Sequence, residues 1–282
     1  MKIRNYLCSG DDKLNTGNLN QLFEPREVFS DSVKYKKALE ALSKNNSFVF
    51  LPLTDTLEAE LQGATINENS FVRVKEPFVK SVDELFSLKS FSYEVPHYKI
   101  ISECFDFEYD KPLMYEMSGL FTFLSFIIPI EQIFRSFRKN PELQNKIIKT
   151  FLEKYFAYIE RLKKFPVKLI SIADPVASLE IIGPKCLEKL VKSFYLKLID
   201  YILNETNFSI YLCPKLFFAI EDLNLMRAES IPVKKQKMQN AILNMLDKKI
   251  IFGDLCINAN PEIKNLKVFS TNFLKASQED FL

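Results

Sequence analysis

The chain has 282 residues, of which 47% are hydrophobic and 26% are charged. This composition is typical of a soluble globular protein, and the length is enough for one large core or two modest ones. The 38 basic and 36 acidic residues leave a net charge of only +2. Because no basic block is present, the sequence argues against a protein that binds DNA or RNA tightly.

The sequence also argues against export and membrane insertion. The first residues, MKIRNYLCSGDD, lack the apolar segment and small-residue cleavage site of a signal peptide. The most apolar run, 119–130, is too short to span a bilayer and contains Pro129. The five cysteines are odd in number and widely spaced, as expected for reduced thiols. We therefore expect a cytoplasmic protein.

The first part of the chain is irregular. Residues 1–47 are polar and contain one predicted helix, over 30–45. The apolar residues on one face of that helix are Val33, Ala38, Leu39 and Leu42. FVFLPL, at 48–53, has the pattern of a buried strand, and the following segment to Gly63 is a short predicted helix. Further on, Ser81 is placed to cap another short helix.

From residue 112 onward strands and helices alternate. Asn140-Pro141-Glu142 is a strong helix start, because it supplies a capping residue, a proline in the first turn and an acid near the positive helix end. The predicted strands are 112–119, 167–174, 208–213, 250–254 and 265–270. The predicted helices run from 119 toward Lys139, then over 140–162, 183–202, 214–226 and 234–249.

This alternation predicts an α/β fold in which parallel strands are connected through helices. No Gly-x-Gly-x-x-Gly follows a strand and the chain has only six glycines, which disfavours a dinucleotide-binding sheet. We therefore predict a (β/α)8 TIM barrel at 48–282, as a single domain, with 1–47 as an N-terminal helical extension that packs on it.

Several polar residues follow or end the predicted strands. They are Asp55, Glu58, Glu116, Asp174, Cys213, Asp254 and Cys256. Because the carboxyl ends of barrel strands converge on one mouth, these residues can share a site. Asp174 and Glu58 are the predicted catalytic residues. Cys213 and Cys256 are either metal ligands or small buried thiols. The single histidine, His97, is expected to be a surface or connector residue.

Segments between about residue 48 and residue 274 resemble, in the same order, the uroporphyrinogen decarboxylase superfamily. The nearest segment is ISIADPVASLEIIGPKCLEKLV, and FLPLTDTLEAELQGATIN is similar to the early strand and helix of that family. Gly119-Leu120-Phe121-Thr122 stands in place of Gly-Pro-Phe-Thr, IYLCPK in place of His-x-Cys-Gly, and IIFGD in place of a late strand ending in Gly-Asn. The resemblance implies a TIM barrel with its site at the strand ends.

The same resemblance helps to decide between two branches of the superfamily, the decarboxylases and the methyltransferases. Decarboxylase members hold their acidic tetrapyrrole substrate with an arginine-rich N-terminal stretch, whereas Arg4 and Arg26 stand alone here. The methylcobamide:thiol methyltransferases bind zinc through His-x-Cys and a later cysteine. Cys213 matches the first cysteine, but Tyr211 replaces the histidine, and the later position falls near Thr271-Asn272. Cys256 is the candidate to substitute for the missing ligand, since metal-bound thiols are deprotonated near neutral pH.

The resemblance leads us to expect a methyltransferase-like protein. It would move a methyl group between a cobamide carried by a corrinoid protein and a small thiol or related acceptor. Asp174 and Glu58 would position the acceptor or a metal, and Cys213 and Cys256 would ligate zinc. Two alternatives stay open, a catalytically degenerate barrel that binds a corrinoid protein and a decarboxylase or lyase that acts on a small acid.

Overall fold

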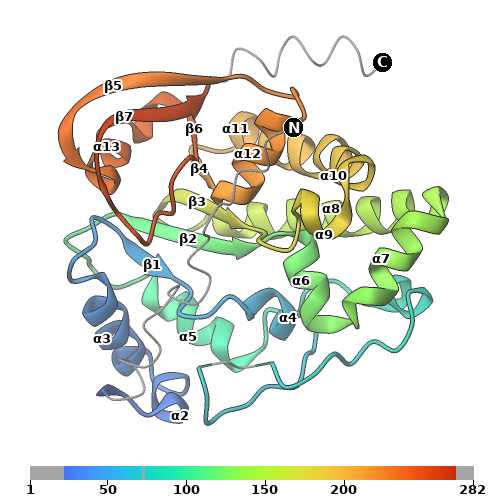
Figure 1. The fold of residues 1–282 in the computed structure, drawn as a ribbon. Coiled ribbons are helices and arrows are strands. Elements are labelled where there is room, and N and C mark those ends of the chain that lie inside the picture. The colour runs from blue at the N-terminus through green and yellow to red at the C-terminus, as the bar shows by residue number, and fades with distance from the viewer. Residues whose placement is uncertain (1–21, 72–73, 271–282) are drawn as a thin grey trace.

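The computed structural model describes residues 22–71 and 74–270 as one α/β arrangement around a single sheet (Figure 1). Five strands run parallel, in the order β1-β2-β3-β4-β6, and two more extend the sheet as β7 and then β5. The strands are β1 (Val49–Leu51), β2 (Leu113–Ser118), β3 (Val167–Ala173), β4 (Ser209–Leu212), β5 (Ala228–Lys237), β6 (Ile251–Phe252) and β7 (Glu262–Phe269). Strand β7 is antiparallel to both of its neighbours.

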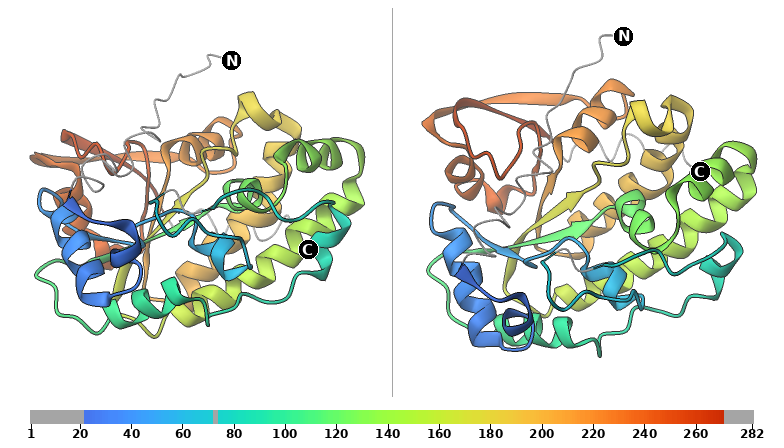
Figure 2. Two further views of the ribbon diagram at one scale, coloured as in Figure 1. Left: turned by 90° about the horizontal axis from the view of Figure 1, so that it is seen from below. Right: turned by 60° about the horizontal axis from the view of Figure 1, so that its bottom comes forward.

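Helices connect the parallel strands and cover the sheet, since parallel neighbours need crossovers. The helices are α2 (Pro25–Val28), α3 (Ser32–Ser43), α4 (Leu57–Leu61), α5 (Pro96–Cys104), α6 (Leu120–Ile127), α7 (Ile130–Lys139), α8 (Pro141–Leu162), α9 (Leu179–Ile182), α10 (Pro184–Leu190), α11 (Leu196–Glu205), α12 (Pro214–Asp222) and α13 (Met238–Leu243). A π-helical turn, Val191–Tyr195, joins α10 to α11, and two 3₁₀ turns lie at Asp83–Ser87 and Leu246–Lys248. In Figure 2 the strands cross the middle of the molecule, with α3 (blue) and α7 (green) at opposite flanks. No helix in the described ranges is long and apolar enough to cross a membrane.

The two faces of the sheet carry different side chains because residues alternate along a strand. On β2, Tyr115 and Met117 belong to the large core between the sheet and its helices, whereas Met114 belongs to a second core that α13 completes. Above Met114 on that second face lies Glu116, which is paired in register with Ser171 of β3 and, through it, with Tyr211 of β4. The sheet face that α13 covers is therefore apolar at the position of Met114 and polar two residues further along the strand, at Glu116 and Ser171.

Most predicted elements are confirmed, with α8 as the best example. Asn140 caps it by accepting a hydrogen bond from the Leu143 N–H at 3.0 Å, and Pro141 occupies the first turn. The helix predicted toward Lys139 is interrupted instead by Pro129, which separates α6 from α7. Val33 was predicted on the buried face of α3 but is 53% exposed, because the buried face is formed by Tyr35, Ala38 and Leu39.

The prediction of a helix over 234–249 is wrong in its first part. Residues 228–237 form β5, which pairs with β7, and α13 begins only at Met238. Strand β5 contains Pro232 and lies at one edge of the described sheet, beside β7. This agrees with the preference of proline for edge strands. Of the predicted extension at 1–47, residues 1–21 lie outside the described residues, and α2 and α3 contribute Val28 and Leu39 to the large core.

Candidate functional site

The turn from β2 into α6 is the centre of the site, and its close packing requires a glycine. The Gly119 N–H donates to the Ala173 carbonyl oxygen at 2.8 Å, which ties the ends of β2 and β3 together. A Cβ atom on Gly119 would lie 2.4 Å from the Cβ of Asp174 and 2.5 Å from the hydroxyl oxygen of Tyr195. No side chain fits in that space.

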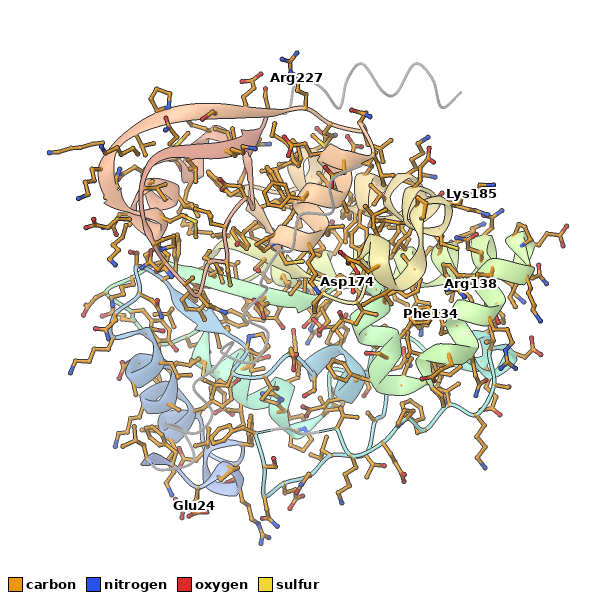
Figure 3. All side chains as sticks on the ribbon, in the orientation of Figure 1. Glu24, Phe134, Arg138, Asp174, Lys185 and Arg227 are labelled. Atoms are coloured by element: carbon orange, nitrogen blue, oxygen red, sulfur yellow. The ribbon has the colours of Figure 1, made fainter. Side chains whose placement is uncertain are left out.

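Asp174, at the end of β3, points into this turn and is fully buried. Its Oδ1 accepts hydrogen bonds from the N–H and the hydroxyl of Thr122, at 2.9 and 2.7 Å. Its Oδ2 accepts from the Phe121 N–H at 2.9 Å and from the Tyr195 hydroxyl, which in turn accepts from the Leu120 N–H. In Figure 3 Asp174 lies near the middle of the molecule, beside the end of β2 and the start of α6.

These hydrogen bonds determine what Asp174 can do. Burial raises the pKa of its carboxyl, while the hydrogen bonds from Tyr195, Thr122 and the N–H groups of Phe121 and Thr122 oppose that rise. Both oxygens have their acceptor positions filled by protein donors at the start of α6, where the N–H groups have no partner within the helix. This geometry suits a residue that holds the turn in place, and the predicted catalytic role of Asp174 stays a prediction.

Cys213 lies next to Asp174, as the strand order predicted. The Asp174 N–H donates to the Cys213 Sγ at 3.3 Å, and the Cys213 N–H donates to the Ile172 carbonyl at 3.0 Å. Cys213 is also the residue from which α12 starts, with Pro214 in the first turn. The sulfur of Cys213 is thus buried, accepts one backbone N–H and lies at the start of a helix.

Tyr211 lies two residues before Cys213 and is influenced by both Cys213 and Cys256. The Tyr211 hydroxyl donates to the Leu255 carbonyl. Burial raises the pKa of this tyrosine well above its ordinary value, and the nearby sulfurs of Cys256 and Cys213 raise it further. The two predicted metal ligands therefore both lie near the ring that replaces the histidine of the family motif.

The side chains in place do not complete a zinc site. Within residues 22–71 and 74–270, no three His, Cys, Asp or Glu side chains converge so as to hold an ion, and a catalytic zinc needs three protein ligands. Thr271 and Asn272, at the position of the later family cysteine, lie outside the described residues. Zinc at Cys213 and Cys256 stays a prediction.

Glu58 is the second buried carboxyl of the site. It lies on α4 with 1% of its surface exposed, and its Oε1 has no hydrogen-bond partner within residues 22–71 and 74–270. Burial raises its pKa to about 8, and the negative charges of Asp55 and Glu116 add to the rise. Hydrogen bonds from the N–H groups of Glu58 itself and Ser118 oppose it but do not cancel it. Glu58 is therefore mostly protonated at neutral pH.

Glu58 and Asp174 flank the same turn. The Ser118 N–H is directed at Glu58, while the Ser118 carbonyl accepts from the Tyr155 hydroxyl at 2.7 Å. The pKa of Tyr155 is raised by burial and then by the charges of both Glu58 and Asp174. The two residues that the sequence predicted as catalytic therefore lie at adjacent positions of the β2–α6 turn, Glu58 at Ser118 and Asp174 at Gly119, and their catalytic role stays a prediction.

Asp254, another strand-end residue, has a different environment. Burial raises its pKa to about 6, Lys267 on β7 lowers it, and Glu221 on α12 raises it. The Lys267 Nζ lies 3.8 Å from the Glu221 Oε1. Asp254 therefore belongs to a group of charges between α12 and β7.

His97 does not lie at the surface as predicted, because it is buried in α5. Its Nδ1 is 3.1 Å from Glu60 Oε1 and its Nε2 is 3.1 Å from the Tyr35 hydroxyl. Glu60 also accepts from the Thr56 hydroxyl at 3.1 Å. The sequence did contain a signal, since Pro96 starts a helix and two acids, Glu58 and Glu60, lie on the short helix α4. These contacts fix α4, and with it Glu58, against α3 and α5.

Replacement of Asp174 by alanine is expected to lower the free energy of unfolding by roughly 3–5 kcal/mol, because several buried donors lose their acceptor. Asp222→Ala, at an exposed position on α12, is the matched control and is expected to change stability little. Chemical denaturation monitored by circular dichroism measures both. A D174A protein as stable as the D222A control would show that the hydrogen bonds of Asp174 do not support the fold.

Glu58→Gln is expected to change how stability depends on pH. Because the folded-state pKa of about 8 lies above the ordinary 4.5, the native state binds more protons than the unfolded state between these values. Stability contributed by this carboxyl therefore falls as pH rises, by about 1.4 kcal/mol per pH unit at most. We expect E58Q to equal the wild type near pH 5 and to be more stable at pH 8. Parallel stability curves over this range would contradict the burial of Glu58 as a neutral acid.

Comparisons with known proteins agree with this architecture. The model of the uroporphyrinogen decarboxylase (URO-D) family matches residues 39–258. A solved structure, "methyltransferase from Methanosarcina mazei", has a TM-score of 0.54 and 17% sequence identity to this chain, which supports a shared fold. The alignment covers 73% of this chain and 63% of the other, so this chain spans less than two thirds of that protein. No curated protein matches the sequence.

In the described part of the chain, the barrel sheet has seven strands, with an antiparallel end in place of a uniform eightfold repeat. The family match covers most of the chain, and the α/β TIM-barrel class and the family resemblance predicted from the sequence are confirmed. The protein belongs to the uroporphyrinogen decarboxylase family.

Proposed function

We propose that this protein is a methyltransferase-like member of its family. In this proposal it moves a methyl group between a cobamide carried by a corrinoid protein and a small thiol or related acceptor. Family membership and a related fold in a protein named a methyltransferase support the proposal. The observation that carries it is the position of Cys213, whose sulfur accepts the Asp174 N–H at 3.3 Å at the start of α12.

Transfer to a thiol requires the acceptor to lose its proton. The thiolate sulfur then forms a bond to the methyl carbon, while the bond from methyl to cobalt breaks and leaves its electron pair on the metal. In this proposal Cys213 contacts the reacting group of the acceptor, and Asp174 fixes Cys213 through its N–H. The turn at Gly119 holds both in place.

Glu58, in the fraction that is ionised at neutral pH, is the proposed proton acceptor. Its pKa of about 8 is close to the ordinary thiol value of about 8.5, and proton transfer is most efficient between groups of similar pKa. Among the residues that the structure describes, its Oε1 has no hydrogen-bond partner, and in the proposal this oxygen takes the proton of a bound molecule. An ordinary exposed glutamate would be a much weaker base toward a thiol.

A second candidate function, binding to a corrinoid protein without catalysis, is favoured by one observation. Tyr211 stands where the family motif has histidine, and its hydroxyl is already bonded to the Leu255 carbonyl. The remaining alternative, a decarboxylase or lyase for small acids, has less support, because the carboxylate oxygens of Asp174 are filled by protein donors.

Methyl transfer from methylcobalamin to small thiols tests the proposal, with zinc content measured on the same samples. Cys213→Ala is expected to lower the initial rate by about 100-fold or more, the scale of losing one group that acts on the reacting atoms. Cys186→Ala, on α10, is the matched control and is expected to leave the rate unchanged.

The outcomes separate the two candidates. A wild-type protein that binds a corrinoid protein but transfers no methyl group would favour the binding function. Transfer that survives Cys213→Ala would place the chemistry elsewhere. Zinc that co-purifies in a one-to-one ratio and is lost in C213A would establish the predicted metal ligand, and metal-free active protein would exclude it.

A further inference from the structure

The described strands do not form a ring that is closed by backbone pairing. In a closed barrel every strand has a partner on both sides, whereas within residues 22–71 and 74–270 β1 pairs only with β2, and β5 pairs only with β7. Strand β1 is also short, since it consists of Val49–Leu51. Contacts other than a strand ladder therefore join the start of β1 to the last part of the sheet.

One side chain on α13 makes most of this connection. Gln239 is fully buried, and its Oε1 accepts a hydrogen bond from the Ser47 N–H at 2.6 Å. Its Nε2 donates to Asn46 Oδ1 at 3.0 Å and to the Ile257 carbonyl oxygen at 2.8 Å. The Ser47 hydroxyl also donates to Asn240 Oδ1. The contact of residues 46–48 with Gln239, Asn240 and Ile257 is called the seam below.

The loop between β6 and β7 is fastened to the same helix. The Gln239 N–H donates to Asn260 Oδ1 and the Met238 N–H donates to the Pro261 carbonyl oxygen, both at 2.9 Å. Apolar packing supports these bonds, because Phe48, Met238 and Ile257 belong to the second core. The seam therefore joins three segments, the residues before β1, helix α13 and the β6–β7 loop, around one buried amide.

The seam is held by fewer contacts than the body of the sheet. Strands β2 and β3 are joined by six pairs of residues in register. The hydrogen bonds of the seam depend largely on Gln239, and their partners lie near solvent, because Asn46 and Ser47 are half-buried and Asn240 is exposed. Water can replace bonds of this kind. Regions with few buried contacts and accessible hydrogen bonds open at a lower free energy than core strands do.

We infer that the barrel opens locally along the seam, and that Gln239 is the residue that keeps it closed. The inference goes beyond the proposed function and does not depend on it. Phe48 and Ile257 lose apolar contacts when the seam opens, so the closed form is the ground state and the open form is a minor one.

Opening of the seam has a consequence for the strand-end residues. Cys256 lies in the β6–β7 loop between Leu255, whose carbonyl accepts from the Tyr211 hydroxyl, and Ile257, whose carbonyl accepts from Gln239. Cys213 is held separately, by the N–H that follows β3. When the seam opens, Cys256 can move while Cys213 stays in place. The seam thus gives this end of the barrel a second arrangement.

Hydrogen exchange of the full chain, resolved to single amides by NMR at several low concentrations of guanidinium chloride, tests the inference. The Ser47 amide reports the seam, and the amides of β3 report the body of the sheet, because β3 has a partner strand on both sides. We expect the protection of Ser47 to be at least about tenfold lower than that of β3 and independent of denaturant, since local opening exposes little surface. Equal protection with equal denaturant dependence would overturn the inference.

Thr122→Val separates local opening from global unfolding. It removes a hydroxyl that donates to Asp174 Oδ1 at 2.7 Å, a contact that is not part of the seam. We expect it to lower the protection of the β3 amides by about fivefold and to leave Ser47 unchanged, because this contact stays intact when only the seam opens. If Ser47 loses protection by the same factor, it exchanges only on global unfolding and the inference fails.

Gln239→Ala shows whether this side chain keeps the seam closed. The reporter is the Ala259 amide, which donates to the Cys256 carbonyl oxygen at 3.1 Å, a bond that the substitution does not remove. We expect its protection to fall about tenfold or more, since the Ile257 carbonyl loses its partner. Gln236→Ala, a half-buried glutamine on β5, is the matched control and is expected to leave it unchanged. Unchanged protection in folded Q239A would refute the role of Gln239, and the wild-type measurement decides on the seam if Q239A does not fold.

Discussion

The structure depends on one buried carboxylate, that of Asp174. A carboxylate without solvent is tolerated only where hydrogen bonds replace its hydration, and here the start of α6 supplies them through Phe121 and Thr122, together with Tyr195. The same contact joins β2, β3 and the helix that follows Tyr195. Gly119 makes it possible, because any Cβ atom there would overlap Asp174. The position of Cys213 follows from this contact, since its sulfur is held by the Asp174 N–H.

This contact explains why two distant segments of the sequence carried the strongest signal. Gly119-Leu120-Phe121-Thr122 and the aspartate of IADP supply the two sides of one hydrogen-bonded turn. The sequence predicted that Asp174, Cys213 and Glu58 would converge, because parallel strands end on one side of the sheet. Helix α8 was equally predictable, since capping by Asn140 is local. The family and the α/β barrel class could also be predicted from the sequence, because the order of its segments is enough to indicate both.

What the sequence did not predict depends on tertiary contacts. His97 looked like a connector residue, yet Glu60 and Tyr35, each distant in sequence, bury it. Strand β5 is rich in lysine and contains proline, so only its pairing with β7 identifies it. The protonated state of Glu58 was also out of reach, because it arises from burial and from Asp55 and Glu116 acting together. The local sequence pattern does not predict these three features, because each depends on residues that are distant in the sequence.

The two buried carboxyls of the site differ in what explains them. The fold alone accounts for Asp174, since it satisfies donors that would otherwise be buried without a partner. The described part of the fold does not account for Glu58, because its Oε1 has no partner there and the charges of Asp55 and Glu116 repel its own. A glutamine there would keep the volume and remove the repulsion, so the carboxyl weakens the native state at neutral pH. Groups that cost stability in this way are characteristic of functional sites. Glu58, more than Asp174, therefore has the environment expected of a residue kept for its chemistry, in agreement with the role proposed for it.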